Sequence, residues 1–211
     1  MFPKREYILL AILILFHTIG LCGMLLPDIR EEMLAYSSMN LYLTFVVLMI
    51  SGGRKSMRYF IFVLMLYLYG MSIELIGVHT GILFGQYQYG ASLGSKFLEV
   101  PYVLGINWVI LVISCSLLSH RLIRNMWGGI ILAALLMTGM DFLIEPVAIA
   151  SDYWSWSGGE VPWFNYLCWF LLAIPPLWVF RKFVIRTEQS LVGIGLCMVY
   201  FLFFGILNLC L

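Results

Sequence analysis

Three acidic side chains stand inside long apolar runs of this chain of 211 residues: Glu74, Asp141 and Glu145. A charge at the centre of a bilayer costs about 2.5–3.5 kcal/mol, so acids in such runs face the interior of a helix bundle. Asp141 and Glu145 are four residues apart and share one helical face. Two carboxyl groups this close do not both ionise easily away from water, and the neutral one can donate a proton near neutral pH. The spacing predicts proton transfer; a structural role for hydrogen-bonded acids is the alternative.

Two loops rich in Gly, Tyr and Trp follow these acids, residues 77–101 (GVHTGILFGQYQYGASLGSKFLEVP) and residues 151–162 (SDYWSWSGGEVP). Non-helical backbone at membrane depth must be shielded or line a cavity, so we expect the first loop to be a re-entrant or interfacial segment that caps the helices. An ordinary interfacial loop with an aromatic belt is the alternative. Aromatic rings here can line a binding site for an apolar ligand and can stabilise a cation through their π faces. The candidate binding residues are His79, Phe84, Tyr87, Tyr89, Asn107, Trp154, Trp156 and Asn165.

Three of these candidates are polar and leave two interpretations open. His79 can relay protons or can be a hydrogen-bonded loop residue. Asn107 and Asn165 stand just inside predicted helix starts, where each can orient a water molecule or satisfy a buried carboxylate.

The composition is that of a membrane protein. Apolar residues make up 63% and charged residues 11% of the chain, against about 45–50% and about 25% in soluble domains. This excludes a soluble globule, a disulfide scaffold and a disordered chain, and the net charge of +1 gives no basic field for nucleic acid. No metal-ligand spacing of His and Cys occurs. We expect one integral membrane domain over residues 1–211, an all-α polytopic helix bundle.

Runs long enough to span a bilayer predict about seven transmembrane helices. The predicted spans are Tyr7–Leu26, Leu34–Ile50, Tyr59–Ile76, Tyr102–Leu118, Trp127–Ala150, Pro162–Phe180 and Leu191–Leu211. The second is the weakest, because it is short and opens with the polar segment 37–40. No small-residue cleavage site follows the first, so we expect that helix to be retained. Pro146 predicts a kink or an end in the fifth helix.

The basic residues alternate between the two ends of these spans. All 12 except Arg30 and Lys96 fall in the N-terminal segment or in the second, fourth and sixth connections. The positive-inside rule then predicts a multi-pass protein of the cell inner (plasma) membrane, with a cytoplasmic N-terminus and an outside C-terminus. This orientation brings Glu74, Asp141, Glu145 and both aromatic loops to the outer side. Most of the other acids lie in connections and are expected to be solvated.

Two segments resemble the membrane-embedded carotenoid hydratase family of the CruF type, which includes carotenoid 1,2-hydratases and bisanhydrobacterioruberin hydratases. They are residues 74–101 (ELIGVHTGILFGQYQYGASLGSKFLEVP) and residues 141–165, with DFLIEPVA, WSW and VPWFN. The resemblance covers roughly residues 70–169. It implies an enzyme that adds water to a terminal double bond of an acyclic carotenoid ψ-end, giving a tertiary alcohol. The implied substrates are lycopene-like, γ-carotene-like or C50 chains from the bilayer. No cofactor is implied, and other carotenoid-pathway enzymes are the expected partners.

The buried acids suit this chemistry. A neutral carboxylic acid protonates the alkene and leaves a tertiary cation, and a second carboxylate accepts a proton from the water that adds. Asp141 or Glu145 is the predicted acid, and Glu74 the predicted base. A membrane lycopene cyclase, which quenches the same cation with an internal double bond, is one alternative. A small proton-coupled transporter that uses the acids as a relay is another.

Overall fold

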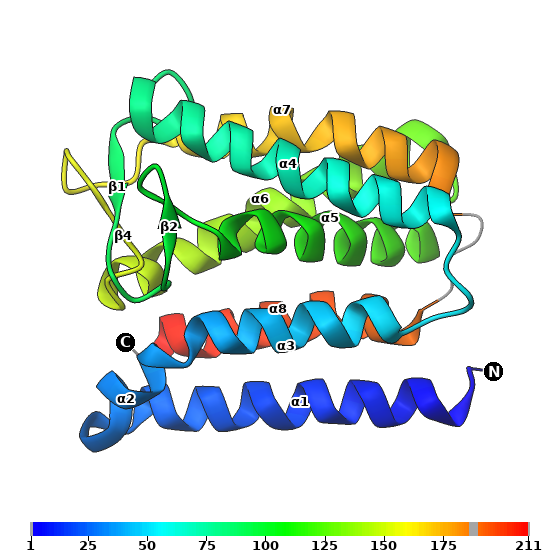
Figure 1. Ribbon diagram of the computed structural model, residues 1–211, viewed down its shortest axis with the longest axis horizontal. Coiled ribbons are helices and arrows are strands. Elements are labelled where there is room, and N and C mark those ends of the chain that lie inside the picture. Colours follow the sequence, from blue (N-terminus) through cyan, green and yellow to red (C-terminus); the bar gives the residue numbers. More distant parts are fainter. Residues whose placement is uncertain (1, 186–189, 211) are drawn as a thin grey trace.

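The protein is an all-helical bundle with a few short strands at one end. A computed structural model describes residues 2–185 and 190–210. The elements are α1 (Lys4–Leu25), a 3₁₀ turn (Pro27–Ile29), α2 (Arg30–Ala35), α3 (Ser37–Ile50), α4 (Met57–Thr80), β1 (Tyr87–Tyr89), β2 (Lys96–Phe97), β3 (Val100–Pro101), α5 (Val103–Leu122), α6 (Met126–Ala150), β4 (Trp154–Trp156), α7 (Trp163–Val179), a π turn (Phe180–Val184) and α8 (Leu191–Cys210). The long helices run along the longest axis of the molecule (Figure 1).

Six described helices are long and apolar enough to cross a membrane, which confirms six of the predicted spans. The predicted second span differs from the structure. It covers the last two residues of α2 and all of α3, and the chain bends by 56° between residues 27–35 and α3. The bend falls where the polar segment 37–40 interrupts the apolar run, so only α3 runs alongside α1. With this bent pair counted as one crossing, α1 begins and α8 ends at opposite ends of the bundle (Figure 1).

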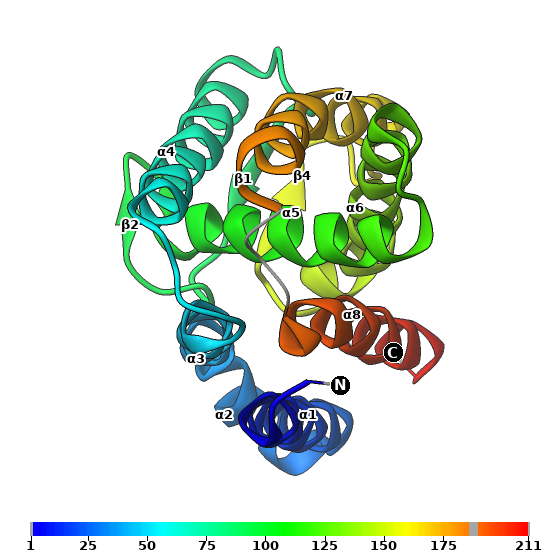
Figure 2. The ribbon, with the colours of Figure 1, turned by 90° about the vertical axis from the view of Figure 1, so that its right-hand side faces the viewer.

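Helix α5 forms the centre of the bundle. Of the residues in its most apolar stretch, 89% are buried, a far larger share than in any other candidate span among the described residues. Helices α4, α6 and α7 surround one side of it, whereas α3 and α8 pack on the other side and α1 lies beyond them (Figure 2). The acids predicted to face the interior lie on α4 and α6, within the first group.

Helix α6 continues through Pro146 as far as Ala150, where the predicted span also ends, so of the two effects expected of this proline an end of the helix does not occur. A proline lacks the N–H that would bond to the carbonyl four residues earlier, and neighbouring helices allow such residues inside membrane spans. The uninterrupted helix keeps Asp141 and Glu145 one turn apart on the same face, both of them buried.

The two aromatic loops meet at the end of the bundle opposite to the start of α1 (Figure 1). Strand β1 of the first loop pairs antiparallel with β4 of the second, with Tyr87 opposite Trp156 and Tyr89 opposite Trp154. Strands β2 and β3 form a second pair within the first loop. The capping segment is therefore built from short strands that join two distant parts of the chain.

Candidate active site

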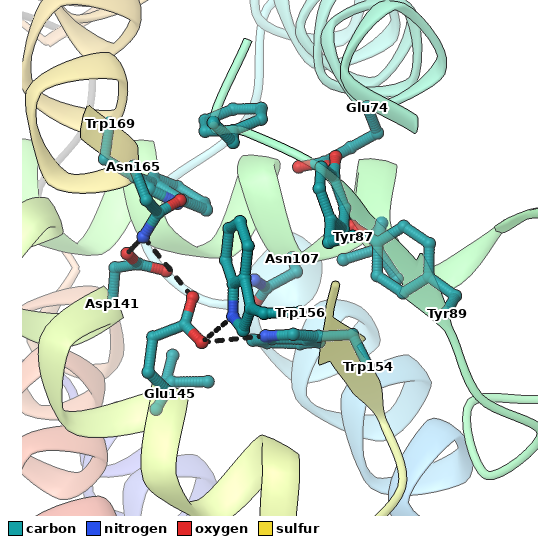
Figure 3. A pocket seen from close by; sticks show the side chains of 13 residues that line it. Glu74, Tyr87, Tyr89, Asn107, Asp141, Glu145, Trp154, Trp156, Asn165 and Trp169 are labelled. Carbon is teal, nitrogen blue, oxygen red and sulfur yellow. Dashed lines mark hydrogen bonds between the residues drawn. The ribbon is translucent and has the colours of Figure 1, made fainter. Parts of the chain in front are cut away.

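The three buried acids line one small pocket beneath the paired loops, with a volume of about 30 Å³. A cavity needs about 10–15 Å³ to hold one water molecule, so this space fits one or two. Figure 3 shows the acids of α6 across the pocket from Glu74, with indole rings between them. The lining residues are Glu74, Phe84, Tyr87, Tyr89, Leu104, Asn107, Asp141, Ile144, Glu145, Trp154, Trp156, Asn165 and Trp169.

Glu74 accepts three hydrogen bonds from side chains of other elements. The Oε2 atom accepts from the hydroxyl groups of Tyr87 at 2.9 Å and Tyr89 at 2.6 Å. The Oε1 atom accepts from the indole Nε1 of Trp108 at 2.9 Å. Glu74 is only 3% exposed, and its acceptor sites are occupied by donors that favour a carboxylate.

Two glycines make this arrangement possible. Gly70 and Gly77 stand one turn to either side of Glu74 on the same face of α4. A Cβ atom at Gly77 would lie 2.6 Å from the Tyr87 hydroxyl, and one at Gly70 would lie 2.6 Å from the Trp108 ring. Both contacts are far too close, so the absence of a side chain at these two positions lets the donors reach Glu74.

The α6 acids are bonded differently. Glu145 also accepts three hydrogen bonds: Oε2 accepts from the indoles of Trp154 and Trp156, each at 2.9 Å, and Oε1 accepts from Asn165 Nδ2 at 3.3 Å. Asp141 accepts one bond within the described part of the chain, from the same Asn165 Nδ2 to Oδ2 at 2.6 Å. The shared amide therefore ties the two acids together (Figure 3).

The pocket is made of two similar units. In each unit a helix carries a glutamate, the next strand supplies two aromatic donors to it, and the next helix supplies one more. The pairing of β1 with β4 brings the donor pairs of both units together. In the sequence alone, these two stretches are only weakly similar.

The hydroxyl groups of the two β1 tyrosines remain protonated and can donate hydrogen bonds. Burial, and after it the negative charge of Glu74, raises the pKa of both Tyr87 and Tyr89 well above the usual value of a phenol. Both hydroxyl groups therefore keep their protons across the physiological pH range and continue to bond to Glu74.

A model of a family described as carotenoid biosynthesis protein matches residues 33–211. The chain belongs to this carotenoid biosynthesis family. It is also 36% identical over 112 residues to a bisanhydrobacterioruberin hydratase of Haloarcula japonica. That match covers 49% of this chain and 38% of the relative's length. No solved structure matches the chain.

For this carotenoid biosynthesis protein, the structure brings nearly all of the candidate residues together. The three acids and all the binding candidates except His79 line the pocket. His79 is exposed in the last turn of α4, and its Nε2 atom lies 3.0 Å from the carbonyl oxygen of Leu98. It is hydrogen-bonded, as the alternative to a proton relay had it, but it belongs to a helix and not to a loop. Asn165 satisfies carboxylates, whereas Asn107 bonds to none of the three among the described residues and faces the pocket.

Sequence reasoning missed several pocket residues of this family member. Trp169 lies one turn after Asn165 on α7, and its ring stacks on that of Trp108 with centroids 4.6 Å apart. The spacing of Asn165 and Trp169 could have indicated a shared face. Leu104 and Ile144 are apolar residues in apolar helices, and they carry no local signal that separates them from ordinary core residues.

Proposed function

We propose that this protein is a carotenoid hydratase, which adds water to the terminal C1=C2 double bond of an acyclic ψ-end. One observation carries the proposal: three buried carboxyl groups and six aromatic rings line a space the size of one or two water molecules. The family membership and the hydratase name of the Haloarcula relative support it. Substrates of the lycopene, γ-carotene or C50 type all present the required end group.

Asp141 is the proposed acid. Each hydrogen bond that a carboxyl group accepts stabilises its anionic form, and Asp141 accepts fewer of them than Glu74 or Glu145 among the described residues. It also lies one helical turn from the more strongly bonded Glu145, whose negative charge disfavours a second anion nearby. Asp141 thus holds the proton and transfers it to C2 of the substrate, which leaves a tertiary cation at C1.

The cation is stabilised by its surroundings before water adds. The rings of Phe84, Trp154, Trp156 and Trp169 line the pocket, and aromatic faces attract cations. The indole N–H groups of Trp154 and Trp156 are held by Glu145, so their rings are fixed before the reaction. A preorganised wall of this kind stabilises developing charge without needing to reorient.

Water addition completes the reaction. Asn107 lines the pocket and, in the part of the chain that the structure describes, bonds to none of the three acids. In this proposal it holds the water, whose oxygen bonds to C1 while Glu74 accepts one of its protons. The sum is one hydrogen at C2 and one hydroxyl at C1, taken from one water molecule. A second pocket water returns the proton from Glu74 to Asp141. This general acid–base pair acts without leaving a charge on the product.

The setting of the reaction is part of the proposal. We place the protein in the cell inner membrane with its N-terminus in the cytoplasm, because the basic connections lie at that end of the bundle. The apolar substrate then reaches the pocket from the bilayer, where other enzymes of the carotenoid pathway leave it.

Pigment analysis tests the proposal. The chain is expressed in cells that accumulate lycopene, γ-carotene or a C50 precursor, and the pigments are separated by chromatography with mass detection. We expect a more polar pigment that is heavier by one water per modified end. A cyclised pigment of unchanged mass would instead identify a cyclase. Unchanged pigments in all three hosts would contradict a role in end-group chemistry.

A further inference from the structure

A second, much larger cavity lies next to the acid pocket, with a volume of about 670 Å³. This is within the range of about 300–1,000 Å³ that is usual for ligand sites. Its walls come mainly from α1, α3 and α8, the helices whose sequences show no motif, and most of the side chains are apolar. The lining includes Phe16, Ile19 and Gly20 of α1 and Phe203 of α8.

The two cavities share part of their walls. Leu104, Asn107, Ile144 and Trp154 line both of them. These residues come from α5, α6 and β4, so they stand between the ring of helices that holds the acids and the outer helices. A ligand in the large cavity therefore ends against the residues that border the acids, with Asn107 and Trp154 at the junction.

The large cavity has apolar residues with high exposure at its rim. Phe16 and Ile19 of α1 are 42% and 51% exposed, and Met39 and Val46 of α3 are 59% and 52% exposed. Because α1 spans the membrane and α3 runs alongside it, these side chains meet the acyl chains of the lipids. The cavity is therefore accessible from the bilayer between α1 and α3, without passage through water.

We propose that this cavity is the binding channel of a linear isoprenoid chain, which enters between α1 and α3 and presents its end group to the acids. This inference rests on the proposed function and adds the path of the substrate to it. A long, thin, apolar chain suits apolar walls that are continuous with lipid and lead to one polar pocket. Chains longer than the cavity extend between α1 and α3 into the bilayer, so the channel accepts several lengths.

Gly20 allows the channel to be narrowed without forcing the backbone. It lines the cavity on α1, and a Cβ atom there would be 3.7 Å from Cε2 of Phe203, an ordinary contact. Gly205 on α8 is the matched control. A Cβ atom there would meet nothing within 4 Å, and Gly205 does not line either cavity. Gly20→Phe and Gly205→Phe thus add the same bulk inside and outside the channel.

The test compares wild type, Gly20→Phe and Gly205→Phe in two measurements. The first is the amount of polyene retained by protein purified in detergent from lycopene-accumulating cells, measured by absorbance against a detergent blank. The second is the ratio of kcat/KM for lycopene to kcat/KM for a short isoprenoid with the same end group. We expect Gly20→Phe to lower both the retained pigment and this ratio at least about tenfold, because overpacking a filled site is costly. Gly205→Phe is expected to match wild type.

The two proposals fail in different ways. Pigment retention that depends on Gly20 in a protein that hydrates nothing would support the channel and overturn the hydratase. Equal retention and equal ratios in wild type and Gly20→Phe would overturn the channel and leave the hydratase standing. Retention no higher than the detergent blank in wild type would also overturn the channel.

Discussion

Buried carboxylates occur at both ends of the bundle, and the two ends use them differently. Near the start of α1, Glu6 is only 2% exposed. It accepts bonds from the backbone N–H groups of Gly52 at 2.6 Å, Leu191 at 2.9 Å and Val192 at 3.3 Å, and from the Ser190 hydroxyl at 3.2 Å. This carboxylate caps the first turn of α8, where free N–H groups and the helix dipole favour negative charge.

At the opposite end, the donors to Glu74, Asp141 and Glu145 are indole, phenol and amide groups of side chains. These acids also line a pocket, whereas Glu6 lines neither of the two cavities described above. The comparison teaches that burial of an acid does not by itself mark a site of chemistry. A cavity beside the acids distinguishes the end with the proposed reactive site from the end where Glu6 caps a helix.

Replacing the proposed acid should lower turnover more than any change at the end of the bundle that holds Glu6. Asp141→Asn keeps the size and the partner amide but removes the transferable proton. We expect turnover of an acyclic carotenoid to fall about 10²–10⁴-fold, the usual contribution of a general acid, with the amount of folded protein unchanged. Asp28→Asn, at an exposed position, is the control. Chromatography of pigment from matched amounts of purified protein measures the effect, and full activity of Asp141→Asn would refute the acid assignment.

A smaller effect is expected from disturbing the donors of Glu74. A methyl group in Gly77→Ala displaces the Tyr87 hydroxyl from its bond to Glu74. One hydrogen bond to a charged group contributes about 1.5–3 kcal/mol, so we expect turnover to fall about tenfold or more. The control is Gly205→Ala.

The double variant sharpens this experiment. Tyr87→Phe removes the same bond, so Gly77→Ala added to it should cost little further activity. Losses that multiply in the double variant would show that Gly77 acts through some other contact, such as that with Phe84.

The smallest effect on chemistry is expected at the structural end. Glu6→Gln places an amide N–H₂ group among donors, which should lower the midpoint of thermal unfolding by about 3–12 °C. Activity per folded molecule should stay within about twofold of wild type. Glu160→Gln, at an exposed position, should change neither quantity. Scanning fluorimetry and the pigment assay give the two values, and a large loss of activity without a loss of stability would contradict the comparison.

The sequence was sufficient to predict most of the spans and most of the residues that line the pocket. Long apolar runs and the few acids inside them are local signals, and the cost of burying a charge turns Glu74, Asp141 and Glu145 into an interior cluster. Only the polar residues 37–40 indicated the bend before α3.

Other features depend on contacts between distant segments and leave little local trace. Glu6 lies in a basic, polar segment and would be expected in water, yet the start of α8 buries it. The pairing of β1 with β4 and the reach of Trp108 through the space left by Gly70 also arise only in the folded bundle. The large cavity lies among helices that are apolar throughout, so its lining residues look like any other lipid-facing or core positions.

We have proposed that the pocket adds water to an alkene by way of a cation. The most direct test is to react purified protein with an acyclic carotenoid in water that carries a heavy oxygen isotope, and separately in deuterated water. We expect one heavy oxygen at C1 in the first case and one non-exchangeable deuterium at C2 in the second, with neither formed by Asp141→Asn. A product of unchanged mass, or one whose oxygen is unlabelled, would contradict it.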